Sequence, residues 1–179
     1  MTKRNSSPSR ALSVCAMVLA VAVVSGPALA EGNGKSHGRP DAVRQELNDL
    51  IAAYSYTYDS KDIVRWLGLF EDDATWSWFG PEGDLVLELN GTDEMRAFFE
   101  PRLVGLTQQG VQTRHLQTNT VLTAFKGNVA KTRTIVLVSW QYESEAAPRL
   151  VHTGHYDDTF VRTRGEWKFK ERSIFVDHH

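Results

Sequence analysis

Hydrophobic residues recur every three or four positions in three stretches of this chain, and this spacing predicts three amphipathic α-helices. The first begins after Pro40, a short second one covers about residues 62–70, and the third follows a turn at residues 90–93. Asp59 or Ser60, at the joint between the first two helices, could cap the second. The first helix directs one apolar face toward a core, formed by Val43, Leu47, Leu50, Ile51, Tyr54 and Tyr58.

The remaining hydrophobic segments alternate with polar residues and are bounded by turn residues, which predicts strands. Two short strands, residues 74–79 and 85–90, flank a Gly-Pro turn. After the third helix the chain is predicted to be all strand, in four segments: residues 112–125, 128–142, 149–162 and 166–178. Helices followed by a long run of strands joined by tight turns indicate an α+β domain and not an α/β domain.

The first thirty residues have the pattern of a signal peptide. A basic start precedes an apolar run at residues 11–24, and the sequence ALA at residues 28–30 suits a signal peptidase. The run is shorter than the roughly 20 residues that cross a bilayer, so we expect cleavage near Ala30 and export to the periplasm or the medium. Lipidation at Cys15 is the alternative, although most of the apolar run follows that cysteine.

Cleavage there divides the chain into a signal peptide (1–30), a Gly-rich flexible leader (31–40) and one domain (41–179). The signal peptide removes three basic residues and no acidic one, so the formal charge of −2 becomes −5. An acidic chain without a Lys/Arg cluster argues against nucleic-acid binding. Cys15 is the only cysteine, so the exported domain is expected to hold its fold without disulfides.

Several short motifs, in their order along the chain, resemble the SnoaL-like branch of the NTF2-like fold, including scytalone dehydratase, bile-acid 7-dehydratase and lindane dehydrochlorinase. The resemblance covers about residues 41–177. Tyr54 and Asp59 repeat the Tyr-x4-Asp spacing of the bile-acid enzyme. The other motifs are YDSKD (58–62), DDATW (72–76), RHLQTN (114–119) and GEWKF (165–169) followed by Arg172.

The resemblance implies a cystatin-like cone, in which N-terminal helices pack on a curved, mostly antiparallel sheet around a pocket. In such relatives an aspartate at the end of the first helix orients a histidine that removes a proton, and those positions here are Asp59 and His115. The resemblance further implies a homodimer, no metal and no organic cofactor. It places five substrate-binding residues in the pocket: Tyr54, Trp76, Asn119, Tyr156 and Arg172.

Simpler roles for these residues stay open. Asp59 alone reads as a helix cap, His115 as a core histidine, and Arg172 as half of an exposed ion pair. Strand alternation puts Asn119 on the face of His115, and Tyr156 on the face of His152. Residues 138–140 hold no ionisable side chain where relatives have a second acid or base, so the reaction of a particular relative does not carry over.

The sequence therefore supports two functions of different classes. The first is a cofactor-independent lyase (a dehydratase) or an isomerase, acting on a small, apolar, cyclic substrate with Asp59 and His115 as a dyad. The second is an exported module that binds a small molecule without converting it, because this fold also has non-catalytic members.

Overall fold

Three helices and six strands make up the residues that the computed structural model describes, 40–178. The predicted signal peptide and all but the last residue of the predicted leader lie outside these residues. The helices are α1 (Pro40–Asp59), α2 (Ile63–Gly68) and α3 (Gly91–Gln108). None of the helices in the described part is long and apolar enough to span a membrane.

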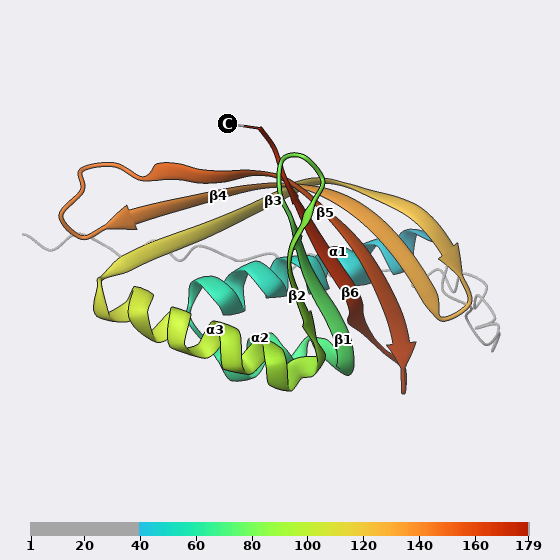
Figure 1. Cartoon of the computed structure of the whole chain (residues 1–179). Helices are drawn as coiled ribbons and strands as arrows, with labels where there is room; N and C mark the ends of the chain where they lie inside the picture. The colour runs from blue at the N-terminus through green and yellow to red at the C-terminus, as the bar shows by residue number, and fades with distance from the viewer. Residues whose placement is uncertain (1–39, 179) are drawn as a thin grey trace, which may run out of the picture. The chain divides into compact units, whose positions relative to one another are not determined.

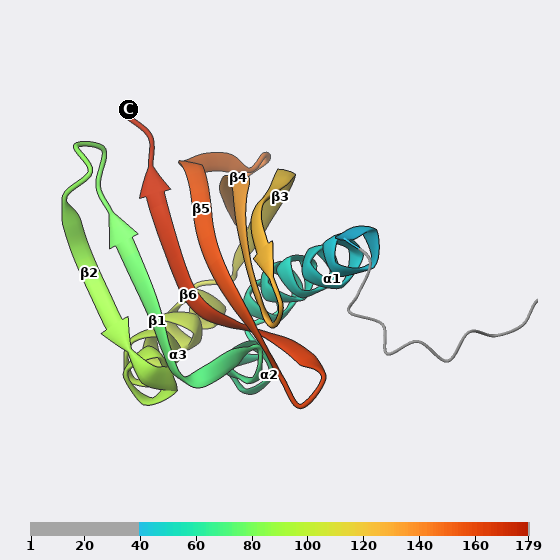
Figure 2. The ribbon, with the colours of Figure 1, turned by 90° about the vertical axis from the view of Figure 1, so that its right-hand side faces the viewer.

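The strands are β1 (Phe70–Phe79), β2 (Leu85–Asn90), β3 (Val111–Lys126), β4 (Val129–Tyr142), β5 (Arg149–Thr163) and β6 (Glu166–Val176). They form one sheet in the order β2-β1-β6-β5-β4-β3. Every neighbouring pair is antiparallel except β1 and β6, which run parallel. This mixed, curved sheet carries the helices on one side, so the predicted α+β fold is confirmed (Figures 1 and 2).

The alternation of buried and exposed residues explains why one face of the sheet is covered. Along β4, Ala130, Thr132, Thr134, Val136 and Val138 are buried, while the intervening residues from Val129 to Ile135 are exposed. Successive side chains of a strand point to opposite faces, so the buried set faces the helices. The interior of the domain therefore lies between this inner face and the three helices.

Aromatic rings fill the part of this interior around α2. Trp66 of α2 is fully buried, with its ring centroid 4.9 Å from that of Phe99 and 5.0 Å from that of Phe70. The Tyr54 ring packs 5.5 Å from Trp66 on the α1 side. Large buried rings each contribute roughly 1.5–3 kcal/mol or more through apolar burial, so this cluster fixes the helices against the sheet.

The joint between α1 and α2 differs from the prediction. α1 ends at Asp59 with Lys61 in the left-handed region (φ 64°), and the backbone N–H groups of Lys61 and Asp62 bond back to the carbonyls of Tyr58 and Thr57. This is the hydrogen-bond pattern of a Schellman helix end. The cap of α2 is Asp62, whose Oδ1 accepts from the N–H of Arg65, and not Asp59 or Ser60.

Candidate active site

A cavity of about 80 Å³ lies between the helices and the inner face of the sheet. Its wall is mostly aromatic, and its ionisable members besides tyrosines are Arg102, His115 and His152. The remaining lining residues are Tyr54, Tyr58, Trp76, Trp78, Phe98, Phe99, Val138, Trp140, Tyr156, Ile174 and Val176.

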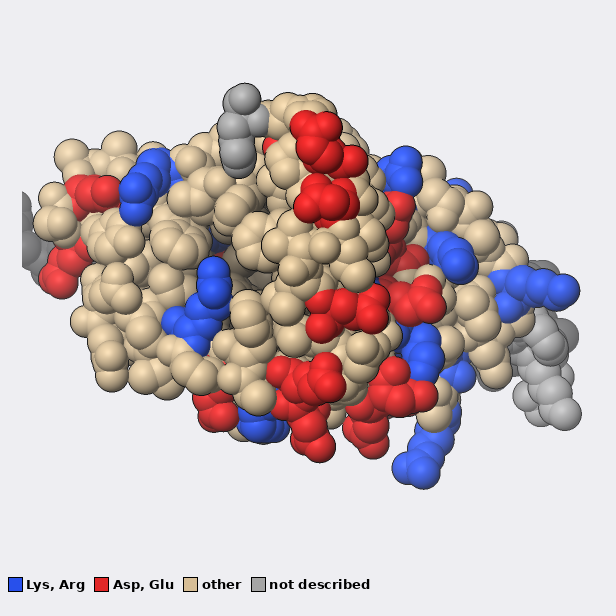
Figure 3. Space-filling view, viewed as in Figure 1, with Lys and Arg blue, Asp and Glu red and all other residues tan. Residues whose placement is uncertain are grey.

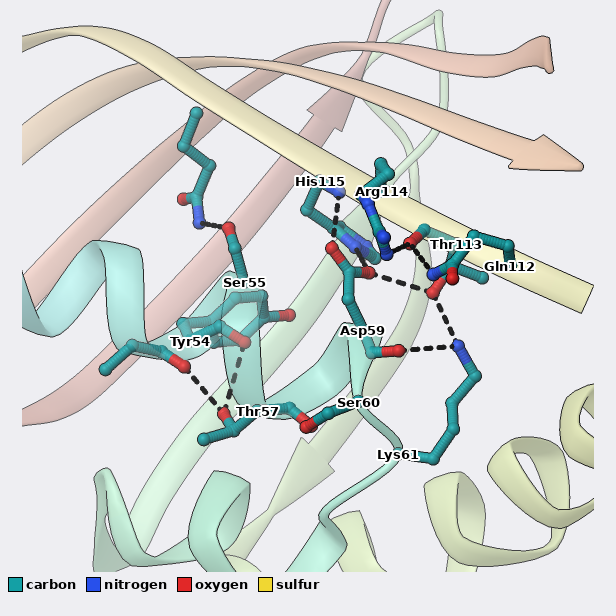
Figure 4. A network of polar contacts seen from close by, with 12 residues as sticks. Tyr54, Ser55, Thr57, Asp59, Ser60, Lys61, Gln112, Thr113, Arg114 and His115 are labelled. Carbon is teal, nitrogen blue, oxygen red and sulfur yellow. Dashed lines mark hydrogen bonds and ion pairs between the residues drawn. The ribbon is translucent and has the colours of Figure 1, made fainter. Parts of the chain in front are cut away.

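Asp59 and His115, which are 56 positions apart in the sequence, form a close pair (Figure 4). His115 lines this cavity, and Asp59 lies behind it, in the groove between α1 and β3. Asp59 ends α1, and His115 lies on β3, which packs beside that helix. The Nδ1 atom of His115 is 2.7 Å from Oδ1 of Asp59, and both side chains are only 9% exposed. Asp59 Oδ2 also accepts the backbone N–H of His115 at 2.8 Å, so one carboxylate holds both the ring and its backbone.

Asp59 is itself held in place by a chain of donors. The Thr113 hydroxyl donates to Asp59 Oδ1 at 2.8 Å, and Lys61 Nζ donates to Thr113 Oγ1 at 2.7 Å and to the Asp59 carbonyl at 3.0 Å. Burial by itself would raise the pKa of Asp59, but the bonds and charge of His115 and the bond from Thr113 outweigh it and lower that pKa. Asp59 is therefore a carboxylate at neutral pH.

This arrangement decides which nitrogen of His115 is available for chemistry. With the Nδ1–H donating to the Asp59 carboxylate, the lone pair of the neutral ring lies on Nε2. The ring packs edge-to-face against Tyr58 (4.9 Å) and Tyr54 (6.3 Å), two residues of the cavity wall. The pair thus has the geometry of an oriented general base.

Two tyrosines and a tryptophan add hydrogen-bond donors to the wall. The indole N–H of Trp76 donates to the Tyr54 hydroxyl at 3.4 Å, and the ring of Tyr156 lies 5.9 Å from that of Tyr54. Burial raises the pKa of both tyrosines, although the nearby Arg172 charge opposes it. Their hydroxyls stay protonated at neutral pH and can donate to a substrate oxygen.

Arg172 lies beneath the cavity and not in its wall. Its side chain is fully buried, its Nε and Nη2 donate to the Asp158 carboxylate at 2.8 and 3.0 Å, and Nη2 also donates to Gln117. The guanidinium carbon is 3.9 Å from the Tyr54 ring centroid and 4.0 Å from that of Tyr156. The alternative role of Arg172, as half of an exposed ion pair, is therefore wrong. Its guanidinium instead packs beneath the rings of the two tyrosines.

Asn119 lies outside the cavity because β3 is irregular there. The register between β3 and β4 shifts between Thr118 and Val121, and Asn119 adopts a left-handed backbone (φ 54°). Such a bulge interrupts the two-residue alternation that put Asn119 on the face of His115. Asn119 is exposed and lines a separate groove between α1 and β3.

The lining residues that the sequence did not single out for the site include Trp78, Arg102 and His152. His152 shares the inner face of β5 with Tyr156, which alternation alone indicated. Arg102 is exposed on α3, with its guanidinium 5.5 Å from the Phe98 ring. No sequence signal marked Arg102 or Trp78, since both depend on how α3 and β1 pack.

The described residues show no metal-binding cluster, and the face in Figure 3 lacks a basic strip. Residues 40–178 contain no group of three His, Cys, Asp or Glu side chains that could hold a metal ion. On the face in Figure 3, acidic side chains gather over β2 and the adjoining end of α3, while Lys and Arg are scattered. That face offers no basic strip for a phosphate backbone.

Comparisons with known proteins agree with the fold. The solved structures that match include the β subunit of a candidate aromatic-ring-hydroxylating dioxygenase and a candidate scytalone dehydratase, both from Novosphingobium aromaticivorans, and ActVI-ORFA from Streptomyces coelicolor. Their identities are 21%, 25% and 18%, and their TM-scores are 0.67, 0.61 and 0.64. They cover 78%, 76% and 76% of this chain, and 92%, 88% and 99% of their own chains.

Sequence comparison gives the family directly. No curated protein matches this chain in sequence. The family model for the SnoaL-like domain matches residues 42–173, which include every element from α1 to most of β6. Solved structures described as NTF2-like and cystatin-like share the fold, which confirms the predicted fold class. This chain therefore belongs to the SnoaL-like domain family.

Proposed function

We propose that this protein is a cofactor-independent lyase of the dehydratase type, or an isomerase, acting on a small cyclic substrate. The observation that carries the proposal is the 2.7 Å contact between Asp59 and His115 at the wall of an aromatic cavity. A buried carboxylate on Nδ1 orients the imidazole and stabilises the imidazolium that forms when Nε2 takes a proton. The likeness to a candidate scytalone dehydratase at 25% identity supports the same reaction class.

The proposed chemistry begins with removal of a proton from a carbon next to a carbonyl group. His115 Nε2 accepts this proton, and the negative charge moves onto the carbonyl oxygen as an enolate. The protonated hydroxyls of Tyr54 and Tyr156 are the donors that stabilise this oxygen, and the Arg172 guanidinium below their rings favours the developing charge. Expulsion of a leaving group gives a dehydratase, and return of the proton to another carbon gives an isomerase.

The cavity also limits the substrate. A volume of about 80 Å³ suits a single substituted ring better than a steroid-sized skeleton lying fully inside. The aromatic and aliphatic lining favours an apolar ring, with polar groups directed at His115, His152 and the tyrosines.

The proposal includes export and self-association. The signal-peptide pattern of residues 1–30 supports an exported enzyme, in the periplasm or the medium. On the outer face of the sheet, Phe79, Phe175, His155 and Ile135 lie in one cross-strand row. The rings of Phe79 and Phe175 stack at 4.5 Å, those of His155 and Phe175 at 5.0 Å, and Ile135 is 41% exposed. An apolar row of this kind suits a second copy of the chain.

A second candidate is a binding module without turnover. The small volume and the many large rings around the cavity favour this alternative, because rings can occupy the space where a substrate would react. The Asp59–His115 pair would then only stabilise the joint between α1 and β3.

One experiment separates the two candidates. The domain is screened by thermal shift against small cyclic ketones, phenols and terpenoids, and every compound that binds is incubated with wild type, Asp59→Asn and Asp157→Asn. If the protein is an enzyme, wild type should convert the compound, and so should the control Asp157→Asn, which changes only an exposed ion pair. Asp59→Asn should lower the rate of conversion by about 10²–10⁴-fold with binding retained. Binding with every compound recovered unchanged would favour the module.

A further inference from the structure

The residues that line the aromatic cavity differ in exposure, and Arg102 of α3 marks its mouth. The most deeply buried lining residues are Tyr54 and Tyr156, each 2% exposed. Of the described residues that line the cavity, Arg102 alone is exposed, and Phe98, over which its guanidinium lies, is half-buried. A basic side chain also borders the hollow between α3 and the sheet in Figure 3. A ligand in the cavity would therefore have one side among buried tyrosines and another beside Arg102.

The Arg102 guanidinium is available to a ligand. Its carbon lies 5.5 Å from the centroid of the Phe98 ring, and within residues 40–178 the guanidinium makes no hydrogen bond or ion pair. The positions three and four residues away on α3 hold two phenylalanines, a glycine and a leucine, so the helix itself offers no carboxylate. The N–H donors of this side chain therefore face water or a ligand.

The charges around the mouth favour an anionic ligand. No Asp or Glu side chain is among the described residues that line the cavity. The positive charge of Arg102 acts on the interior of the cavity: burial raises the pKa of the lining residue Tyr58, and the Arg102 charge opposes this rise. An anionic group at the mouth would pair with the guanidinium, whereas a neutral or cationic ligand would leave it unpaired.

A carboxylate fits this cation better than a phosphate. The planar guanidinium can donate two parallel N–H bonds to a carboxylate, with one charge against one. A phosphate monoester brings nearly two charges at neutral pH, and the described lining includes no Lys or second Arg to meet the other charge. The aromatic and aliphatic residues behind Arg102 suit an apolar ring that carries the carboxylate.

We propose that Arg102 binds the carboxylate of a cyclic carboxylic acid whose ring occupies the aromatic cavity. The inference rests on the proposed function, because it names the ligand class of the same cavity, and it applies to an enzyme and to a binding module alike. With the carboxylate held at the mouth, the opposite side of the ring lies toward Tyr54 and Tyr156. Arg102 thereby determines which molecules bind and how they are oriented.

The test compares benzoate with benzamide, which has the same ring and nearly the same size but no charge. Wild type, Arg102→Gln, Arg102→Lys and Arg96→Gln are titrated with each compound, and the indole N–H signals of the tryptophans are followed by NMR. Trp78 and Trp140 line the cavity and report binding there, whereas Trp167 lies outside the lining and is the internal reference. Arg96, on the same helix but outside the lining, is the matched control.

The expected result is a preference for the acid that depends on Arg102. Wild type and Arg96→Gln should bind benzoate about 10–100-fold more tightly than benzamide, as is typical of hydrogen bonds between charged groups. Arg102→Gln should lose this difference by weakening benzoate alone, and Arg102→Lys should keep part of it because a point charge remains. Since the mouth is exposed, the preference should also shrink as the salt concentration rises from about 20 mM to about 500 mM.

Three results would overturn the proposal: equal affinities of the two compounds for wild type, an undiminished preference in Arg102→Gln, or a preference lost in His115→Gln instead. Failure of both compounds to shift the Trp78 and Trp140 signals, while a cyclic ketone or phenol does shift them, would also refute it. If no cyclic compound of either kind binds, the proposed small-molecule function of the cavity fails as well. A thermal unfolding midpoint accompanies each variant, and Arg102→Ala replaces the glutamine variant if that variant fails to fold.

Discussion

Two neighbouring aspartates of β5 form ion pairs that differ mainly in burial, which allows an unusually direct stability test. Asp158 pairs with Arg172 at 2.8 Å, and both side chains are fully buried. Asp157, on the opposite face of the same strand, pairs with Arg133 at 2.6 Å, and these side chains are 37% and 57% exposed. By distance alone, the exposed pair would be the stronger one. Burial predicts instead that breaking the Asp158–Arg172 pair costs more stability than breaking the Asp157–Arg133 pair.

The expected magnitudes follow from what each change leaves behind. Asp158→Asn leaves the Arg172 guanidinium buried without a countercharge, which costs about 3–5 kcal/mol. Asp157→Asn leaves an exposed arginine that water can solvate, so its cost is at most about 1 kcal/mol. At about 2–4 °C per kcal/mol for a domain of this size, the unfolding midpoint should fall by roughly 6–20 °C for Asp158→Asn.

The measurements are thermal unfolding, which gives the shift of the midpoint temperature, and urea unfolding, with the midpoint and the slope fitted together, both followed by circular dichroism. A third variant, Asp158→Leu with Arg172→Met, removes both charges and should restore stability to within about 1–2 kcal/mol of wild type. That recovery is expected because Nη1 of Arg172 has no hydrogen-bond partner within residues 40–178, so the native pair is incompletely satisfied. Equal costs for Asp157→Asn and Asp158→Asn would refute the reasoning.

Three further perturbations test other parts of the structure. Gly154→Ala should destabilise the domain by at least about 1–3 kcal/mol, measured by urea unfolding, because the added Cβ would overlap the carbonyl oxygen of Phe175. The folded-state pKa of Asp59 is lowered, so its contribution to stability is present above the ordinary carboxyl pKa of about 3.9 and is lost as pH falls through the folded value. The difference in unfolding free energy between wild type and Asp59→Asn should therefore shrink below about pH 4 in a pH series, and a constant difference would contradict it. Phe175→Asp should convert a dimer to a monomer in sedimentation at unchanged secondary structure, and a wild-type monomer would refute the outer-face contact.

Local patterns predicted most of the elements. The three- and four-residue spacing of Val43, Leu47 and Ile51 gave α1 its buried face, and all three are buried. β1 begins at Phe70, four residues before the predicted start at residue 74. The prediction missed this start because the acidic residues that follow Phe70, where the strand is exposed, weaken the strand pattern. The prediction of a strand to residue 178 likewise extended β6, which ends at Val176.

The sequence placed some residues of the candidate site correctly and misplaced others. The family resemblance selected Asp59 and His115, and the structure brings them together in one hydrogen-bonded pair. The resemblance put Tyr156 at the cavity wall, where the strand is regular and the structure also has it, whereas alternation misplaced Asn119, where a bulge shifts the register. No local pattern reports a bulge, because it depends on the pairing of β3 with β4.

The sequence by itself determined the periodicity of each helix and strand, the order of the elements and the family, since these depend on neighbouring residues. Only the tertiary structure decided that Arg172 is buried against Asp158, and that His152 stands across Val138 from His115. Those relations depend on strand order and register, which pair residues far apart in the chain. That pairing sets burial and cross-strand distance, and these determine the charge states of the buried groups.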